Sequence, residues 1–251
     1  TNVFKTVIPD VLAYYSFDVD ESSSGSVTDE SGNGRDLSFP GGANDPTWTA
    51  SGQRGGAYDF DGNDYLSRSG TFLNGHDGLT FIAWGRSDTV GTDAGFYNAF
   101  APDGTDRFGF RYDDDGAFGS GDDLVKGGID VTGGATQTES RSNVQTTGWQ
   151  HWTAEWNSGD EIDFYLDGVL ESTTFSDGST SGTTRGATTL YIGDGAKSVR
   201  WDGLLDEIGF FNRSLTASEI TNLSTHKITP IGAPSGTIYV ISARVNVTAS
   251  S

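Results

Sequence analysis

Turn residues interrupt this chain at short intervals along most of its length, and that spacing limits the fold more than any other feature. Between the interruptions lie short runs in which apolar and polar residues alternate, the pattern of a strand with one buried face. Many short strands separated by Gly, Asn, Asp and Pro are typical of a sandwich or barrel. The clearest interruptions are Ser31–Gly34, Phe39–Gly42, Asp61–Asp64, Asp103–Gly104, Asp115–Gly116, Asp167–Gly168 and Asp177–Gly178.

The runs between these turns predict an all-β fold with one short helix. Both faces of Leu79–Arg86 are largely apolar, which indicates a central strand under a second layer. Thr216–Leu223 predicts the helix, with Ser214 or Thr216 as its cap and Glu219 in its first turn. Residues 113–123 and 127–147 predict loops, apart from a short strand at Gly128–Val131. The predicted strands are Val11–Phe17, Ala57–Phe60, Asp64–Ser67, Leu79–Arg86, Asp106–Tyr112, His151–Asn157, Glu161–Leu166, Thr188–Gly193 and Gly203–Phe211.

Both ends of the chain carry strand-like segments outside this pattern. Thr237–Val247 alternates cleanly, and Thr1–Pro9 is similar, yet neither has a predicted partner in the sandwich. We therefore divide the chain into a tail at 1–10, a domain at 11–227, and a linker with a second tail at 228–251. The first residue is Thr1, so either a leader has been cleaved or the numbering begins inside a longer chain.

Charge narrows the class of partner. The chain has 35 Asp and Glu against 15 Lys and Arg, for a formal net charge of -20. Phosphate binding needs clustered Lys and Arg, so nucleic acid is not expected as a partner.

No apolar run is long enough to span a membrane, so no membrane insertion is expected. A hydrated acidic surface over an aromatic-rich core suggests a halophilic source, with an ordinary acidic extracellular domain as the alternative. The chain has no Cys, which excludes disulfides and thiolate metal sites.

Specific motifs stand in a fixed order along the central part of the chain. They are Ala13–Asp18, Asp29–Gly34, Ala57–Leu66, Leu79–Trp84, Trp149–Ala154, Ile162–Gly168 and Gly203–Ile220. This series resembles the laminin-G-like branch of the concanavalin-A-like lectin and glucanase jelly-roll family, over about residues 11–224. The resemblance implies a two-sheet antiparallel jelly-roll sandwich with one concave and one convex sheet.

A calcium site is the main chemical hypothesis. Ca²⁺ takes about six to eight oxygen ligands, and the Asp29–Gly34 loop offers such oxygens in a glycine-rich turn. The resemblance implies a structural Ca²⁺ near this loop, within reach of the Asp-Glu pair of the closing strand. The alternative is that the loop residues only make Asx turns and that the strand carboxylate is a surface charge. The predicted ligands are Asp29, Asn33, Asp206 and Glu207, with Asp18 as a further candidate.

The sequence does not predict catalytic residues. Glu161, Asp163 and Tyr165 alternate where retaining glycosidases of this fold carry Glu, Asp and Glu. Because a tyrosine takes the place of the acid, the leaving group has no proton donor.

Sugar-binding sites commonly contain an exposed aromatic ring, which acts as a platform on which the sugar stacks. Five aromatic residues are candidates for exposed platforms, although core packing is the commoner role for each. These candidates are Trp48, Tyr97, Tyr112, Trp156 and Trp201. Sequons at Asn212, Asn222 and Asn246 permit glycosylation of a secreted chain.

The function predicted from these features is a non-catalytic binding or adhesion module. It would recognise glycans or a surface protein outside the cell, on a cell surface or on a virion. An alternative is a structural subunit of a surface filament or virion appendage, assembled with copies of itself through its terminal strands, unless these tails pair with each other or continue into a further domain. A glycoside hydrolase is a distant third.

Overall fold

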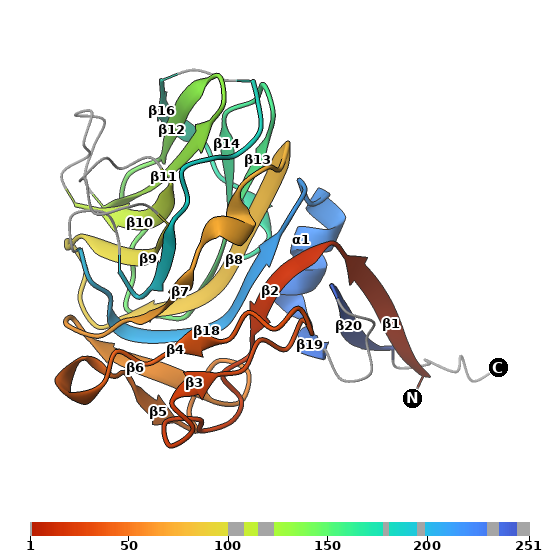
Figure 1. Ribbon diagram of the computed structural model, residues 1–251. Helices are drawn as coiled ribbons and strands as arrows, with labels where there is room; N and C mark the ends of the chain where they lie inside the picture. The colour runs from red at the N-terminus through yellow and green to blue at the C-terminus, as the bar shows by residue number, and fades with distance from the viewer. Residues whose placement is uncertain are drawn as a thin grey trace.

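The computed structural model describes residues 2–99, 108–114, 123–177, 181–194, 199–229 and 236–244. Two large antiparallel sheets face each other, which confirms the predicted jelly-roll sandwich (Figure 1). One sheet has eight strands and the other has nine. A separate three-stranded sheet formed by the chain ends projects from one side of the sandwich (Figure 1).

The eight-stranded sheet contains the longest strands. Its order is β15-β14-β13-β8-β18-β6-β5, with β2 paired to β18 as well. β8 lies between β13 and β18, which confirms Leu79–Arg86 as part of a central strand. The bounds are β2 Val11–Tyr15, β5 Thr47–Thr49, β6 Ala57–Asp61, β8 Gly78–Ser87, β13 Gln150–Asn157, β14 Ile162–Leu166, β15 Val169–Leu170 and β18 Asp202–Phe211.

The nine-stranded sheet has the order β16-β12-β11-β10-β9-β17-β7-β4-β3. Its bounds are β3 Ser26–Val27, β4 Leu37–Ser38, β7 Leu66–Ser69, β9 Ala94–Asn98, β10 Gly109–Asp113, β11 Leu124–Val131, β12 Gly134–Ser140, β16 Thr173–Ser176 and β17 Thr189–Ile192. Short 3₁₀ helices at Gly42–Asn44 and Thr71–Leu73 lie where the chain passes from the nine-stranded sheet to the eight-stranded sheet, between β4 and β5 and between β7 and β8.

The hairpin of β11 and β12 confirms the short strand predicted at Gly128–Val131 and corrects the prediction of a loop at residues 134–140. The two strands pair from Lys126–Glu139 to Val131–Gly134. Ile129 and Val131 from β11 reach the core, whereas Gly127 and Gly128 leave two successive positions without side chains. These glycines weaken the apolar alternation that marks a strand in the sequence.

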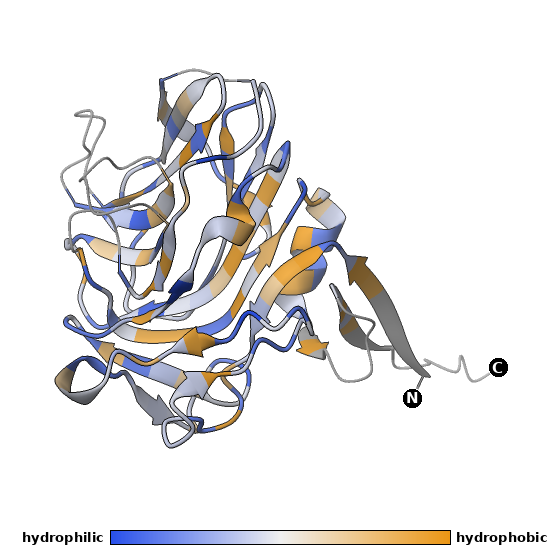
Figure 2. Cartoon of the chain, viewed as in Figure 1, coloured by the Kyte–Doolittle hydropathy of each residue, from blue (hydrophilic) through white to orange (hydrophobic). Residues whose placement is uncertain are grey.

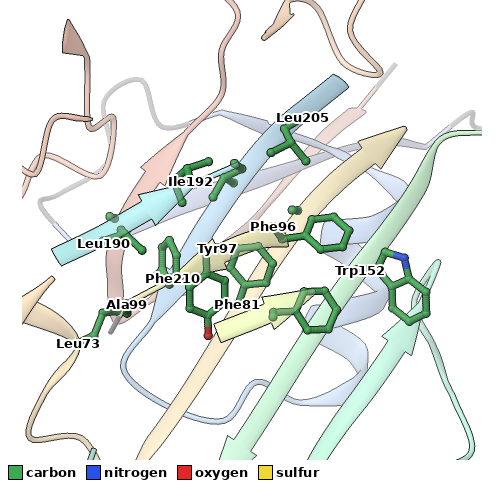
Figure 3. Packing of buried hydrophobic residues seen from close by; sticks show 14 of the residues in the cluster. Leu73, Phe81, Phe96, Tyr97, Ala99, Trp152, Leu190, Ile192, Leu205 and Phe210 are labelled. Carbon is green, nitrogen blue, oxygen red and sulfur yellow. The ribbon is translucent and has the colours of Figure 1, made fainter. Parts of the chain in front are cut away.

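The core fills the space between the two large sheets. Inward residues alternate along each strand, and the aromatic rings among them contact one another directly. The ring centroids of Phe81 and Tyr97 are 4.6 Å apart, and those of Phe81 and Phe210 are 5.2 Å apart. Figure 3 shows the Phe81 and Phe210 rings of the eight-stranded sheet beside Tyr97, Leu190 and Ile192 of the nine-stranded sheet. This contact across the sheets fixes which residues of each strand can face solvent.

A second, smaller core lies on the outer face of the eight-stranded sheet, under helix α1 (Ala217–Thr225). Tyr14, Ile82 and Phe211 contribute from the sheet, and Ile220 and Leu223 from the helix. Figure 2 shows apolar residues on the helix and on the strands beside it. Thr216 and Glu219 form a complete capping box at the start of α1, which confirms Thr216 as the cap.

The terminal segments find no partner in the two large sheets, as the sequence indicates, and pair with each other instead. β1 (Asn2–Pro9) runs antiparallel to β20 (Thr237–Arg244) from Asn2–Arg244 to Pro9–Thr237. β19 (Lys227–Thr229) pairs with the other edge of β20. The inner part of this sheet joins the second core through Ile8, Ile228 and Ile238. Residues 245–247 of the predicted final strand lie outside the described residues.

Candidate functional site

A β-bulge in β18 places two acidic residues on the outer side of the eight-stranded sheet. The pairing of β18 with β8 is irregular between Asp206 and Gly209. Glu207 has a φ of 52°, a left-handed conformation that is uncommon for residues other than glycine. A bulge re-aims side chains that would otherwise alternate across the sheet. The Asp206 and Glu207 carboxylates therefore lie near enough to interact with each other.

Both carboxylates are buried and only partly hydrogen-bonded. Oδ2 of Asp206 accepts a bond of 2.9 Å from the backbone N–H of Arg54, and Oε2 of Glu207 accepts a bond from the Tyr14 hydroxyl. The other oxygen of each carboxylate is buried without a hydrogen-bond donor. Burial raises the pKa of both groups above their usual range, and their mutual repulsion adds to this for Glu207.

Arg54 connects this cluster to helix α1. Its guanidinium donates to the carbonyl oxygens of Ser224, at 2.7 Å, and of His226, at the end of the helix. It also lies over the ring of Trp84, 5.3 Å from the centroid. A cation at a helix C-terminus is favourable because the helix dipole is negative there. Burial, together with Arg54, lowers the pKa of His151 to about 3, so this histidine is neutral at physiological pH.

Asp29 and Asn33 organise the backbone of their own loop. The Asp29 carboxylate accepts bonds from the N–H groups of Tyr14, Ser31 and Arg35, at 3.1, 3.0 and 2.9 Å. The Asn33 amide donates to the carbonyl oxygens of Val11 and Leu12. These bonds correspond to the turn-forming alternative raised for the loop.

The predicted calcium ligands therefore fall into two groups with different surroundings. Asp206, Glu207 and Asp18 interact electrostatically with one another. Asp29 and Asn33 bind backbone groups instead. Within the described part of the chain, no three His, Asp or Glu side chains converge closely enough to hold a metal as they stand. Asp206 and Glu207 supply buried oxygens without donors, which suits a cation only in part, so calcium stays a prediction.

The predicted aromatic platforms are mostly core residues, which corrects that hypothesis. Tyr97, Tyr112, Trp156 and Trp201 are at most 4% exposed. They face inward because each lies in or next to a strand whose inner face fills the sandwich. A ring enclosed in this way cannot stack on a sugar from solvent. Trp48 is half-buried, with its indole N–H bonded to the Phe17 carbonyl oxygen at 2.9 Å.

Sequence reasoning missed a pair of tyrosines on the outer face of the nine-stranded sheet. Leu66, Leu190 and Ile192 are fully buried on the inner face. Their neighbours Tyr65 and Tyr191 therefore face outward, where their half-buried rings meet edge to face at 5.6 Å. This alternation was readable in the sequence, but the prediction relied on residue type alone and selected other tryptophans and tyrosines.

Two polar side chains complete this surface. Tyr191 pairs across the strands with Ser67 on one side and with Asn98 on the other. Asn98 faces outward because Tyr97 and Ala99 on either side of it are buried. We call the group of Tyr65, Ser67, Asn98 and Tyr191 the tyrosine patch. It combines ring faces with hydroxyl and amide groups, the combination that binds sugars through both stacking and hydrogen bonds.

Arg200 borders the tyrosine patch and is held from several sides. Its guanidinium carbon lies 4.6 Å from the centroid of the Tyr65 ring. Its Nε is 3.3 Å from the Asp194 carboxylate, and its Nη1 donates to the Asn63 carbonyl oxygen. Burial raises the pKa of Asp194 to about 6, and Arg200 opposes that shift. At neutral pH the pair is therefore mainly an ion pair.

The three residues compared with the Glu, Asp and Glu of retaining glycosidases have different surroundings in the structure. Tyr165 belongs to the second core and is 8% exposed, whereas Glu161 is exposed before β14 begins. Asp163 lies opposite Glu155 on β13. Burial is the main cause that raises the pKa of both groups.

Of the three sequon asparagines, Asn212 and Asn222 are half-buried, and Asn246 lies outside the described residues.

The family follows from a match over most of the chain. Residues 60–221 match the model of the concanavalin A-like lectin/glucanases superfamily, of the laminin-G type. The chain belongs to this superfamily. The match contains β8, β13 and β18, the three strands at the centre of the eight-stranded sheet, and all four residues of the tyrosine patch.

Solved structures of the superfamily fold resemble this chain at low sequence identity. Domain 4 of a GH43 extracellular arabinanase from Geobacillus stearothermophilus, in complex with arabinotriose, has a TM-score of 0.61 at 18% identity, covering 86% of this chain and 99% of that one. The binding domain of botulinum neurotoxin serotype G scores 0.58 at 12% identity, covering 85% and 50%. Trypanosoma rangeli sialidase, with the inhibitor DANA, scores 0.55 at 14% identity, covering 86% and 33%.

These likenesses show the fold and no more. The chain spans about half of the neurotoxin binding domain and a third of the sialidase. A comparison with curated proteins gives no match. Among the described residues, no helix is both long and apolar enough to cross a membrane.

Proposed function

We propose that this superfamily member is a non-catalytic, extracellular glycan-binding module that holds its ligand against the tyrosine patch. The observation that carries the proposal is the outward-facing pair of Tyr65 and Tyr191, flanked by Ser67 and Asn98. Aromatic faces stack on the apolar faces of sugar rings, while hydroxyl and amide groups bond to sugar hydroxyls.

The superfamily relatives support a binding role. The arabinanase domain is described in complex with arabinotriose, and the neurotoxin domain is described as a binding domain. The arabinanase is also described as extracellular. These are properties of the relatives, and they support the same class of partner and the same location for this chain.

A non-catalytic role is supported by the residues at the strand where glycosidases of this fold carry their carboxylates. Tyr165 is packed in the second core in place of an acid. Hydrolysis needs an acid and a base or nucleophile on either side of the scissile bond. We therefore expect binding without turnover.

A screen of immobilised oligosaccharides tests this proposal. The full chain should retain at least one class of glycan, and prolonged incubation with that glycan should release no shorter product by chromatography. Failure to bind any glycan would remove the proposed function. Release of shorter products would contradict its non-catalytic part and direct attention to Glu155 and Asp163.

We also propose that Asp206 and Glu207 hold a structural calcium ion, with Asp18 beside them. The supporting observation is the buried oxygen of Asp206 and of Glu207 that has no hydrogen-bond donor. Ca²⁺ would offset the repulsion between the two carboxylates. Calcium should raise the thermal midpoint of the wild type relative to chelator, and should have a smaller effect on Asp206→Asn. Equal midpoints with calcium and with chelator would exclude a calcium site.

No observation favours assembly through the terminal strands, because these strands are paired with each other in the structure.

A further inference from the structure

The cation at the tyrosine patch already has a carboxylate partner. Arg200 lies against Tyr65 and forms an ion pair with Asp194. Asp194 is 8% exposed, so water screens this pair less than it screens a surface pair. An acidic sugar that approached Arg200 would meet the Asp194 carboxylate as well.

Other arginines of the same sheet are neutralised in the same way. Arg111 on β10 is 2.7 Å from Asp113. Arg185 is 3.1 Å from Asp130 of β11. Each guanidinium has a carboxylate at contact distance, although the Arg185 side chain is more exposed than that of Arg200, so salt screens its pair more strongly.

No carboxylate among the described residues pairs with Arg68 of β7, but this arginine does not serve the patch. It follows Ser67 in the strand, so its side chain leaves from the opposite face. Its guanidinium lies 5.2 Å from the centroid of the Phe72 ring, away from the outer surface. The groups that the tyrosine patch itself offers are the uncharged hydroxyl and amide groups of Ser67, Asn98 and the two tyrosines.

From this arrangement we infer that the tyrosine patch selects uncharged glycans and rejects glycans that carry carboxylate or sulfate groups, with Asp194 as the residue that determines this selectivity. The inference rests on the proposed function, because it names the ligand class of the same site. The physical reason is that Arg200, the cation beside the patch among the described residues, is already paired with Asp194, so an anionic sugar would lose water and would also face that carboxylate. A neutral sugar meets neither cost, since its hydroxyl groups need only hydrogen-bond partners.

A matched pair of trisaccharides tests the inference by calorimetric titration at one fixed ionic strength. α-1,4-Linked galactotriose is the neutral probe, and trigalacturonate, which carries a carboxylate on each sugar ring of the same backbone, is the acidic probe. We expect the wild type to bind the neutral trisaccharide at least about tenfold more tightly. Equal or tighter binding of trigalacturonate would overturn the inference while leaving glycan binding in place. If neither trisaccharide binds, and the oligosaccharide screen is also negative, the proposed function fails and the inference fails with it.

If the screen identifies a different neutral glycan, the comparison is repeated with that glycan and its uronic acid counterpart. The same two results, preference for the neutral form or for the acidic form, then decide the inference.

The variant Asp194→Asn gives a gain of binding that a structural role would not produce. It removes the counter-charge of Arg200 and keeps the size of the side chain. We expect affinity for the acidic probe to rise by about tenfold or more, with little change for the neutral probe. The control Asp130→Asn frees Arg185, which lies outside the patch, and should leave both affinities unchanged. An unchanged preference in Asp194→Asn would contradict the role of Asp194.

Discussion

At the scale of single residues, exposure decides whether an aromatic ring can stack on a sugar from solvent. Four of the five aromatic residues predicted as platforms are in the core, where they cannot. Exposure depends on strand phase, and the phase of Tyr191 follows from the buried Leu190 and Ile192. The Asp-Glu pair of the closing strand was identified from the sequence, whereas its bulge was not, because Glu207 has no sequence signal for a left-handed backbone.

Asp194 predicts a pH dependence of stability. Burial raises its pKa from 3.8 to about 6, so the folded chain holds this proton more tightly than the unfolded chain does. The free energy of unfolding therefore includes a contribution that is present below about pH 4 and is lost as the pH rises to about 6. Asp194→Asn cannot lose a proton, so this part of the pH dependence should disappear.

The free energy of unfolding of Asp194→Asn minus that of the wild type should therefore increase by about 1 kcal/mol from pH 4 to pH 7. This value is reduced for solvent screening. Urea unfolding at both pH values measures the difference. The same pH dependence in both proteins would show that Asp194 has an ordinary pKa.

At the scale of secondary-structure elements, alternation predicted the long strands well. β8 and β18 begin and end within one residue of their predicted bounds, and the helix begins after the predicted cap Thr216. β11 and β12 were mostly missed because glycine takes the place of apolar residues in β11 and polar residues dominate β12. Their pairing depends on contacts with distant strands, which local sequence does not record.

Helix α1 offers a test at this scale. Thr216→Ala removes the side chain that accepts the Glu219 N–H and so opens the capping box. We expect the free energy of unfolding to fall by about 1 kcal/mol. Thr225→Ala, at the exposed far end of the helix, should change it by less than about 0.5 kcal/mol. Chemical denaturation of both variants distinguishes a working cap from an incidental contact, for which the two losses would be equal.

At the scale of the whole molecule, the sequence predicted the sandwich but not the role of its ends. The termini form a sheet that covers part of the second core with Ile8, Ile238 and Val240. These residues lie far apart along the chain, so each end alone looked like a strand without a partner.

Removal of residues 1–9 and 229–251 should therefore destabilise the chain. Each buried aliphatic side chain contributes about 1.5–3 kcal/mol, so the loss of Ile8, Ile238 and Val240 should cost roughly 5 kcal/mol. Thermal unfolding of the full and trimmed chains measures this, with light scattering to check that both are monomers. An unchanged thermal midpoint would show that the terminal sheet does not support the fold.

We propose that the acidic surface is an adaptation to high salt. Repulsion among carboxylates should oppose folding at low ionic strength, and salt should screen it. The thermal midpoint should rise steeply from about 0.01 M to about 1 M salt, where the Debye length falls from about 30 to about 3 Å. A midpoint that is independent of salt would contradict the halophilic interpretation.

The central claim, that a glycan binds at the tyrosine patch, is tested most directly by titrating the best glycan from the screen into three proteins. Relative to the wild type, Tyr191→Ala should weaken binding by at least about tenfold, equivalent to 1.4 kcal/mol. Trp149→Ala removes another half-buried ring, one that lies beside Arg86 next to the eight-stranded sheet, and should bind like the wild type. Undiminished binding by a folded Tyr191→Ala protein would place the ligand elsewhere and contradict the proposed site.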